Sequence, residues 1–468
     1  MSDQPARAKN LLLINADQLR HDSLGYRGLR PVRTPNLDRL AAESVVYTRA
    51  FTPLPVCAPA RQAILCGRHP DSFGAQWNYD QVPAPTVHPE WCWPRQLQQR
   101  GYNTAYLGRF HVSPTLHPDA FGYGEWVSWA GHKQLIREKY PNAQYTGGWL
   151  GCESPVALED SGTHWMANQA VRMIEKFASQ DKPWHIWVDY EEPHLPCRPS
   201  APFSTMYDPE TIEPWEGYGD PFIHKPYCHK QQTISWGTDE MTWEKDFRYM
   251  VARYFGVISQ LDQAIGRILE ALERSGQKEN TIVAFTSDHG DMCGSHQMLD
   301  KHYVLYDDIC RVPLMARVPG VKPRVCDAFV SNCLDLPFSF IDWLGLEHPE
   351  IEHGRALPLT AEDDAAARDH IVSTSNGQQF GLYSTRMIRD DRWKYVWNLT
   401  DVDELYDLES DPGEKVNLIA GPAQQERIAA MRRRLNDDLR AHGDPFVGSM
   451  WINRQLLEGK KWLGASFE

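Results

Sequence analysis

Short apolar runs alternate with an amphipathic segment along the chain. Residues 11–15, 184–190 and 281–287 are mostly apolar and are followed by polar residues, a pattern typical of parallel strands buried on both faces. Residues 246–275 carry apolar side chains at alternating spacings of four and three before a glycine, which predicts a long helix. This strand–helix–strand order predicts an α/β fold with a large, mixed and mostly parallel sheet flanked by helices.

Weaker patterns complete the expected organisation. Residues 197–243 are rich in Pro, Tyr, Trp and Gly without clean periodicity, and we interpret them as a long insertion near the mouth of a binding site. Other expected elements are a helix over 34–40, a strand over 101–108, a helix over 336–344, a hairpin over 389–396 and a helix over 428–439. An acidic linker lies at 358–368. We therefore predict a large domain over residues 1–358 and a small α+β subdomain with a tail over residues 359–468.

The composition limits the class of protein. A chain of 468 residues with 42% hydrophobic residues can form an ample core, and no apolar run approaches the ~20 residues that span a bilayer, so we expect no membrane partner. The net charge of −14 argues against nucleic acid as a partner, so an anionic ligand must be attracted by local positive charge. The ten cysteines lack CxxC pairs and regular spacing, which predicts neither a disulfide scaffold nor a zinc ribbon.

The first ten residues are polar and lack the apolar centre of a signal peptide. We therefore expect a cytoplasmic protein. The alternative is a periplasmic or secreted protein whose leader has been removed.

Cys57 is the first candidate for chemistry. Three prolines between residues 53 and 59 keep the preceding chain extended, and a helix is expected over 60–65. A thiol just before a helix N-terminus has a lowered pKa and is a credible nucleophile. The alternative is a small buried thiol in a proline-rich loop. Arg61, four residues further on, favours the nucleophile.

Polar residues follow two of the expected strands. Asp17 and Gln18 come after the first strand, and Asp288 and His289 come after the strand at 281–287, at the edge where α/β sheets bind ligands. Two carboxylates about 4 Å apart repel by roughly 4 kcal/mol at an effective dielectric constant of about 20, so convergence requires a cation. Oxygen ligands suit a hard divalent ion, and the imidazole extends the choice to manganese or zinc. The alternative for Asp17 is a cap on the next turn.

Three basic residues lie near expected strand ends. Arg109 and His111 leave the strand at 101–108 on one face, although a solvated edge is the commoner explanation for such a pair. His194 lies between two prolines in a rigid loop that suits an acid or base, and an exposed loop histidine is the alternative. Asn78 is a lesser candidate for the same site.

The segment from Cys57 to Gly67 reads Cys-x-Pro-x-Arg followed by Ala-x-Leu-x-Gly. It resembles the signature of the type I sulfatases, which belong to the alkaline-phosphatase-like superfamily. In that family a maturation enzyme oxidises the cysteine to formylglycine, and the hydrated aldehyde is the nucleophile. The resemblance implies that Cys57 is the modified residue and that Arg61 holds the hydrate. Gln62 and Cys66 replace a small hydroxyl residue and a threonine, and neither change removes a group that the chemistry needs.

Other segments resemble the family in the same order along the chain. They are the run over 34–40, Gly-Arg-x-His at 108–111 with arginine in place of the usual lysine, Pro-His-x-Pro at 193–196, Asp-His-Gly at 288–290 and the lysine at 301. The resemblance implies a single divalent ion, calcium first and manganese second, on Asp17, Gln18, the modified Cys57, Asp288 and His289. It implies that charge on the transferred group is offset by Arg61, Arg109 and Lys301. His194 would protonate the departing alcohol, and His111 would take a proton from the modified residue. We assign Asn78 and His296 to substrate binding.

These patterns together predict a sulfuric ester hydrolase that acts on a small-molecule or saccharide sulfate monoester. The segment after 359 is similar to the family's small carboxyl-terminal subdomain, a short antiparallel sheet crossed by a helix, and the tail beyond Gly443 is expected to serve contacts in a homo-oligomer. One alternative is a phosphonate or phosphate ester hydrolase of the same superfamily, in which the positions of Arg109 and His111 tend to hold neutral hydroxyl residues. The other is a carbohydrate-binding homologue whose catalytic site has decayed.

Overall fold

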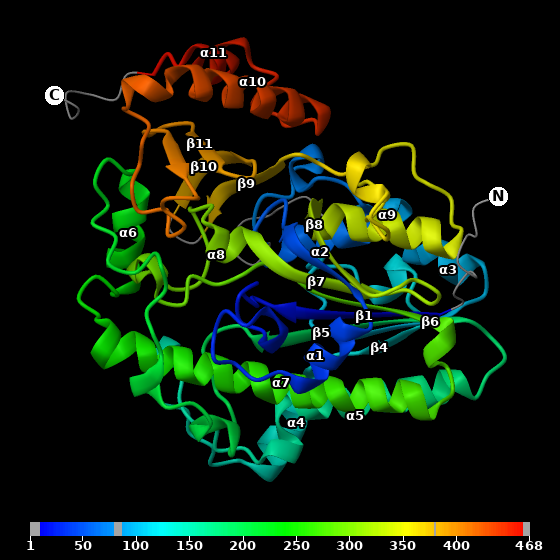
Figure 1. Cartoon of the computed structure of the whole chain (residues 1–468). Helices are drawn as coiled ribbons and strands as arrows, with labels where there is room; N and C mark the ends of the chain where they lie inside the picture. Colours follow the sequence, from blue (N-terminus) through cyan, green and yellow to red (C-terminus); the bar gives the residue numbers. More distant parts are fainter. Residues whose placement is uncertain (1–9, 79–86, 379–380, 462–468) are drawn as a thin grey trace.

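The computed structural model describes residues 10–78, 87–378 and 381–461 (Figure 1). Residues 1–9 and the end of the tail lie outside the described residues. The expectation that the chain carries no signal peptide therefore stays a prediction. The bounds of the central strands are β1 Asn10–Asp17, β2 Val45–Phe51, β3 Asn103–Gly108, β4 Glu125–Val127, β5 Trp184–Pro193, β6 Thr281–Ser287, β7 Arg311–Arg317 and β8 Arg324–Ser331. They form one sheet in the order β4-β3-β5-β1-β6-β7-β2-β8.

The sheet is mixed because of β7. This strand pairs antiparallel with both of its neighbours, β6 and β2, whereas the other adjacent strands pair in parallel. The α/β fold expected from the alternation of strands and helices is therefore confirmed.

Helices cover both faces of this sheet (Figure 1). The lower layer in that view contains α1 (Pro35–Ala42), α5 (Gly162–Ala178) and α7 (Arg248–Arg274), and the upper layer contains α2 (Cys57–Cys66), α3 (Pro94–Gln99) and α9 (Asn332–Leu344). Leu12 and Ile14 of β1 pack in the core cluster of the lower layer, and Leu11 and Leu13 pack in that of the upper layer. Successive strand residues point to opposite faces, so a strand buried on both sides needs a continuous apolar run.

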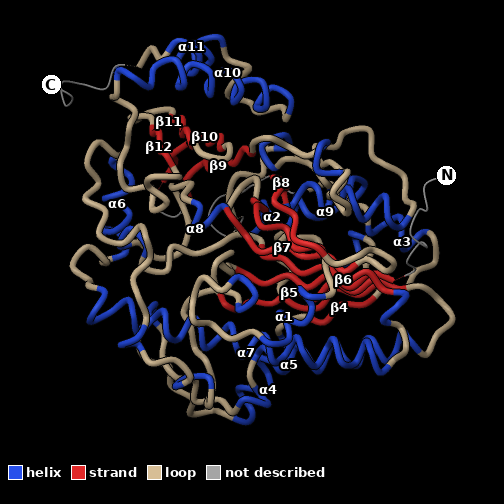
Figure 2. Tube along the Cα trace, in the orientation of Figure 1, coloured by secondary structure: helices blue, strands red, loops and turns tan. Residues whose placement is uncertain are grey.

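A second, smaller sheet follows the large one (Figure 2). Its antiparallel strands, in the order β12-β11-β10-β9, are β9 Ile371–Gln378, β10 Gly381–Arg389, β11 Trp393–Asn398 and β12 Glu404–Asp407. Apolar residues of α10 (Gln425–Ala441) pack on this sheet. The expected hairpin and final helix are both present. The domain boundary at 358 stays a prediction.

The remaining helices are α4 (Ala130–Lys139), α6 (Tyr227–Trp236), α8 (Asp307–Cys310) and α11 (Met450–Glu458). Neither α6, inside the segment interpreted as an irregular insertion, nor α11, inside the tail, was expected. The pattern of α6 is obscured because it buries polar side chains: Gln232 donates to the Lys301 carbonyl oxygen at 2.7 Å, and His229 lies 2.8 Å from the Tyr306 hydroxyl. A role of the tail in oligomer contacts stays a prediction. Among the described residues, the helices are all too short or too polar to cross a bilayer.

The topology brings three acidic residues to one edge of the sheet. β1 pairs in parallel with β5 on one side and with β6 on the other. Asp17 ends β1, Asp288 directly follows β6, and Asp189 lies within β5, paired with Asn15 two residues before the end of β1. Because parallel strands end at the same edge, these carboxylates meet there, as expected for Asp17 and Asp288.

Candidate active site

Cys57 is the first residue of α2, with extended Val56 as the N-cap. We expected Cys57 immediately before the helix, so it lies one residue further into the helix than predicted. The thiol is fully buried, and the next backbone N–H, that of Ala58, donates to Oδ1 of Asn78 at 2.9 Å. Asn78 thus supports the turn that presents Cys57.

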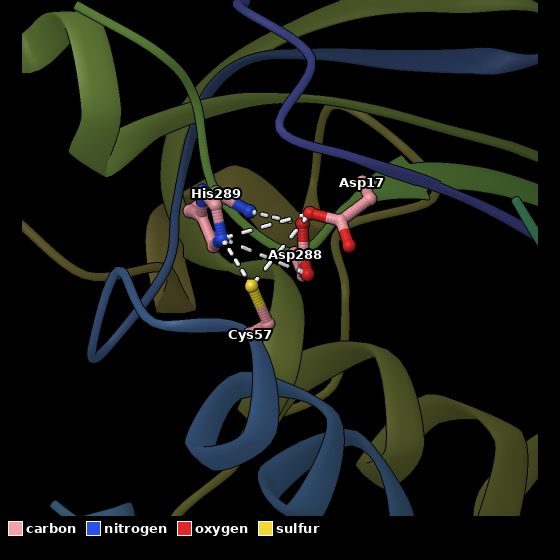
Figure 3. A group of neighbouring side chains, drawn as sticks. All are labelled: Asp17, Cys57, Asp288 and His289. Atoms are coloured by element: carbon pink, nitrogen blue, oxygen red, sulfur yellow. Dashed lines mark hydrogen bonds and ion pairs between the residues drawn. The ribbon is translucent and has the colours of Figure 1, made fainter. Parts of the chain in front are cut away.

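Four side chains that could hold a metal ion converge on this point (Figure 3). They are Asp17, Cys57, Asp288 and His289, and all four are buried. The Cys57 Sγ lies 3.2 Å from Nε2 of His289 and 3.7 Å from Oδ1 of Asp17. The same Nε2 lies 3.8 Å from Asp17 Oδ1 and 3.8 Å from Asp288 Oδ2.

The ionisable side chains of this four-residue cluster are suited to binding a cation. Burial raises the pKa of Asp288 to about 6, although Arg61 opposes the shift. The Asp288 Oδ2 is buried and lies 2.8 Å from Nη1 of Arg61, although that contact lacks the geometry of a good hydrogen bond. Carboxylate and imidazole donors are ligands of hard and borderline divalent ions, so the chemistry of this cluster fits such an ion.

Arg61 lies beneath this group and is completely buried. Its guanidinium bonds three carboxylates: Asp17 at 3.1 Å, Asp189 at 2.9 Å and Asp288 at 2.8 Å. Burial opposes the charge of Arg61, but these acids together raise its pKa well above the ordinary value. The guanidinium therefore stays charged and links the ends of three strands.

Asp189 was not expected at the site. It is fully buried and also accepts hydrogen bonds from Asn15 at 2.9 Å and from the Tyr106 hydroxyl. The signal that could have identified it is an acidic residue inside an otherwise apolar strand, because a carboxylate is almost never buried without a partner.

Arg109 and His111 reach the site from the end of β3. Gly108 adopts a φ of 116°, and a Cβ there would lie 1.8 Å from the Asp189 carbonyl oxygen, so only glycine permits this close approach. The next N–H, that of Arg109, donates to this oxygen at 3.2 Å, and the Arg109 Nη1 lies 2.7 Å from Asp17 Oδ2. His111 is hydrogen-bonded to Cys57 and, being largely buried, has a lowered pKa.

His194 and Lys301 approach Cys57 from the other side. Their Nε2 and Nζ atoms lie 3.1 Å apart, and His194 is hydrogen-bonded to Cys57. Burial opposes ionisation of the Cys57 thiol, but Lys301 and His289 outweigh it and lower its pKa well below the usual value. Burial and Lys301 also oppose protonation of His194, yet Asp17 and Cys57 leave its pKa raised.

Gln18 meets different partners from those expected. Its Oε1 accepts from Lys301 Nζ at 3.0 Å, and its Nε2 donates to Asp291. Both ends of the amide are therefore engaged by neighbouring side chains. Its assignment as a metal ligand stays a prediction.

His296 lies in a different buried cluster. Its Nδ1 is 2.6 Å from Asp220, its ring stacks on Tyr306 at 3.8 Å, and it is fully buried. Among the described residues, the hydrogen bonds, ion pairs and ring contacts of His296 do not join it to Cys57. Its assignment to substrate binding stays a prediction that the geometry does not support.

A cavity of about 440 Å³ adjoins the site. Arg109 and His194 line it together with residues of α4 and of the loop that follows β5. The buried centre therefore has a neighbouring space of the size that holds small molecules, which is roughly 300–1,000 Å³.

Comparisons with known proteins point in one direction. The sequence profile of the sulfatase family matches residues 9–346, and that of the C-terminal region of N-sulphoglucosamine sulphohydrolase matches residues 294–441. The chain is 30% identical over 479 residues to the uncharacterized sulfatase YidJ of Escherichia coli strain K12, an alignment that covers 97% of this chain and 92% of the relative.

Solved structures share the fold. A phosphonate monoester hydrolase from Silicibacter pomeroyi superposes with a TM-score of 0.80 at 23% identity, covering 93% of this chain and 96% of the other. A putative sulfatase from Bacteroides thetaiotaomicron superposes with a TM-score of 0.75 at 23% identity, covering 95% and 94%. These likenesses show the same architecture along nearly the whole chain.

Proposed function

The chain belongs to the sulfatase family and is a sulfuric ester hydrolase, and we propose that its nucleophile derives from Cys57. In this proposal a maturation enzyme oxidises the Cys57 side chain to formylglycine, so that an aldehyde oxygen replaces the sulfur and two hydrogens are lost. The hydrated aldehyde then supplies the attacking hydroxyl. The observation that carries this proposal is that Cys57 lies within reach of His111, His194 and His289 in one buried centre.

The proposed metal ligands are Asp17, Asp288, His289 and the modified Cys57, with Gln18 as a further candidate. A divalent ion bound there, calcium first and manganese second, would polarise a sulfate oxygen and favour the ionised form of the attacking hydroxyl. The convergence of these four buried side chains supports this assignment.

The basic residues have separate proposed roles. Arg109 and Lys301 offset the negative charge of the transferred group, since stabilising such charge is usually the largest catalytic contribution. Arg61 makes contacts to three carboxylates and therefore holds the ligands in place. This differs from the direct contact with the hydrate that the family resemblance implies.

The two histidines act on protons. His194 lines the adjoining cavity and is hydrogen-bonded to Cys57, which suits donation of a proton to the departing alcohol oxygen. His111, also hydrogen-bonded to Cys57, suits removal of a proton from the modified residue. A lowered pKa favours the neutral ring that a base requires.

The test compares Cys57→Ala with Cys66→Ala. Both thiols are buried in α2, but burial raises the pKa of Cys66 to about 12, so it is an inert control. We expect Cys57→Ala to lose 4-nitrophenyl sulfate hydrolysis and Cys66→Ala to retain it. Peptide mass spectrometry should detect formylglycine at residue 57 in protein from a competent host. Wild-type activity in Cys57→Ala would disprove the proposed nucleophile, and preference for a matched phenyl phosphonate would favour the alternative hydrolase.

A further inference from the structure

The cavity beside His194 lies on the alcohol side of the proposed sulfate site. His194 is the proposed proton donor to the leaving oxygen, and it lines the cavity together with Arg109. The rest of the wall includes α4 and the segment after β5. A leaving group attached to that oxygen would therefore extend into this space.

Several polar atoms in the cavity wall have no partner. Trp129 is 7% exposed and Ser200 1% exposed, yet the indole Nε1 of Trp129 and the Oγ of Ser200 form no hydrogen bond within the described ranges. The same holds for Oε2 of Glu192. Buried polar atoms nearly always have partners, and all three belong to side chains that line the cavity, so a small rotation of these side chains would offer both donors and acceptors to a ligand that carries several hydroxyl groups.

The cavity also has a cationic side. The Arg198 guanidinium lies over the Tyr145 ring, with 4.5 Å between Cζ and the ring centroid, and its Nε is buried without an acceptor in the described chain. Lys133 is exposed on α4 and lines the same wall. Burial, assisted by Glu191, raises the pKa of Glu192 to about 8, so Glu192 carries little negative charge at neutral pH.

These features differ from the rest of the molecule. The chain has a net charge of −14, whereas three basic side chains, Arg109, Lys133 and Arg198, line this cavity with two acidic ones, Glu191 and the largely protonated Glu192. An anionic ligand is attracted by local positive potential even when the whole protein is negative. Aromatic side chains with unused hydrogen-bonding atoms are suited to a sugar ring, which has apolar faces and a polar edge.

We propose that the cavity binds the alcohol half of the ester and that this alcohol is a saccharide unit with a second anionic group, a carboxylate or a further sulfate, held by Arg198 and Lys133. The inference rests on the proposed function, because it assumes that the alcohol departs on the side of the site where His194 lies.

The experiment uses two pairs of sulfate esters, each matched in the position of the scissile sulfate. N-Acetylglucosamine 6-sulfate is compared with glucosamine 2-N,6-O-disulfate, and glucose 2-sulfate is compared with glucuronate 2-sulfate. The first pair tests a second sulfate and the second pair tests a carboxylate. We expect kcat/KM to favour the more anionic member of at least one pair by about tenfold or more, the size of one hydrogen bond to a charged group.

Variants then locate the recognition. Arg198→Gln should reduce the preference about tenfold, and Lys133→Gln should reduce it by a smaller factor because its side chain is exposed. Arg137→Gln is the matched control, since Arg137 is exposed one helical turn beyond Lys133 on α4 and does not line the cavity. This control should leave the preference unchanged.

The outcomes separate the two proposals. Equal kcat/KM within both pairs, or a preference that survives Arg198→Gln, would overturn the inference. Loss of activity towards every ester, including 4-nitrophenyl sulfate, would instead count against the proposed function. Calorimetric titration of glucuronate, glucosamine 2-N-sulfate and glucose into the wild-type protein tests the cavity independently of turnover, and binding no tighter for the two anions than for glucose would also overturn it.

Discussion

Replacing Asp189 by asparagine should destabilise the protein strongly although Asp189 is neither a proposed metal ligand nor a proposed proton donor. Its carboxylate accepts hydrogen bonds from Arg61 Nε at 2.9 Å, Arg61 Nη2 at 3.1 Å and Asn15 at 2.9 Å, and also from the Tyr106 hydroxyl. Asparagine offers one oxygen and one N–H group in the same space. Each carboxylate oxygen accepts two of these bonds, so two donors would then face the amide NH2 group in a site without exposed surface.

The magnitude follows from the number and kind of bonds lost. A hydrogen bond to a charged group contributes about 1.5–3 kcal/mol, and two are lost when one carboxylate oxygen becomes an amide N–H group. Breaking a buried ion pair by removing one partner costs about 3–5 kcal/mol. Arg61 keeps Asp17 and Asp288, so we expect a loss of about 3–5 kcal/mol in the free energy of unfolding and not more.

Urea unfolding followed by tryptophan fluorescence measures this loss. Tyr106→Phe is the matched control, because it removes one donor and leaves the carboxylate, and it should cost about 2 kcal/mol. The double variant Asp189→Asn/Arg61→Gln tests whether the effect acts through Arg61. Once the guanidinium is absent, the change at Asp189 should cost at least about 1 kcal/mol less than in the wild type.

A loss below about 1 kcal/mol in Asp189→Asn would refute the reasoning. It would mean that Asp17 and Asp288 alone balance the charge of Arg61. Additivity in the double variant would likewise show that Asp189 acts without Arg61.

Three further predictions concern the metal, the proton donor and the pH dependence of stability. Asp288→Asn should lower the metal content of the purified protein and kcat together, as measured by elemental analysis and 4-nitrophenyl sulfate hydrolysis; full metal content in this variant would remove Asp288 from the ligand set. His194→Ala should reduce kcat/KM far more for alkyl sulfates than for 4-nitrophenyl sulfate, because a poor leaving group depends more on protonation, and an equal loss for both would contradict the role of proton donor. Burial lowers the pKa of His69 to about 3, so the unfolded chain binds the extra proton and His69 contributes stability that is lost as the pH falls below 6.5. Between pH 7 and pH 5, the free energy of unfolding measured in urea should therefore fall by about 2 kcal/mol more for the wild type than for His69→Asn. An equal change in the two proteins would show that His69 is protonated in the folded protein.

Local patterns were sufficient to predict much of the fold. The strands β1, β5 and β6 and the helix α7 were predicted correctly because a strand buried on both faces must be apolar throughout and a helix must repeat its buried face. The convergence of Asp17 and Asp288 was also predictable, since both follow parallel strands. The polar helix α6 was missed because its buried residues include Gln232 and His229, so burial there does not follow hydrophobicity.

The spatial environment of the site residues depended on tertiary structure. His296 and Lys301 are five residues apart in sequence, but backbone with positive φ at several positions between 293 and 302 reverses the chain and directs them to different clusters. Gln18 follows Asp17 directly, yet its amide bonds Lys301 and Asp291. Sequence spacing sets the distance along the chain and not the direction in which a side chain points.

Asp189 shows the same limit most clearly. A single acidic residue in an apolar strand signals that a buried partner exists, but nothing near it identifies Arg61, which lies 128 residues earlier. The sequence by itself determined the central strands β1, β5 and β6, the long helix α7 and the residues that follow the ends of β1 and β6, because those properties depend on neighbouring residues. Only the tertiary structure decided that three carboxylates share one guanidinium, because a buried charge is balanced by whichever groups the packing of distant segments brings within a few ångströms of it.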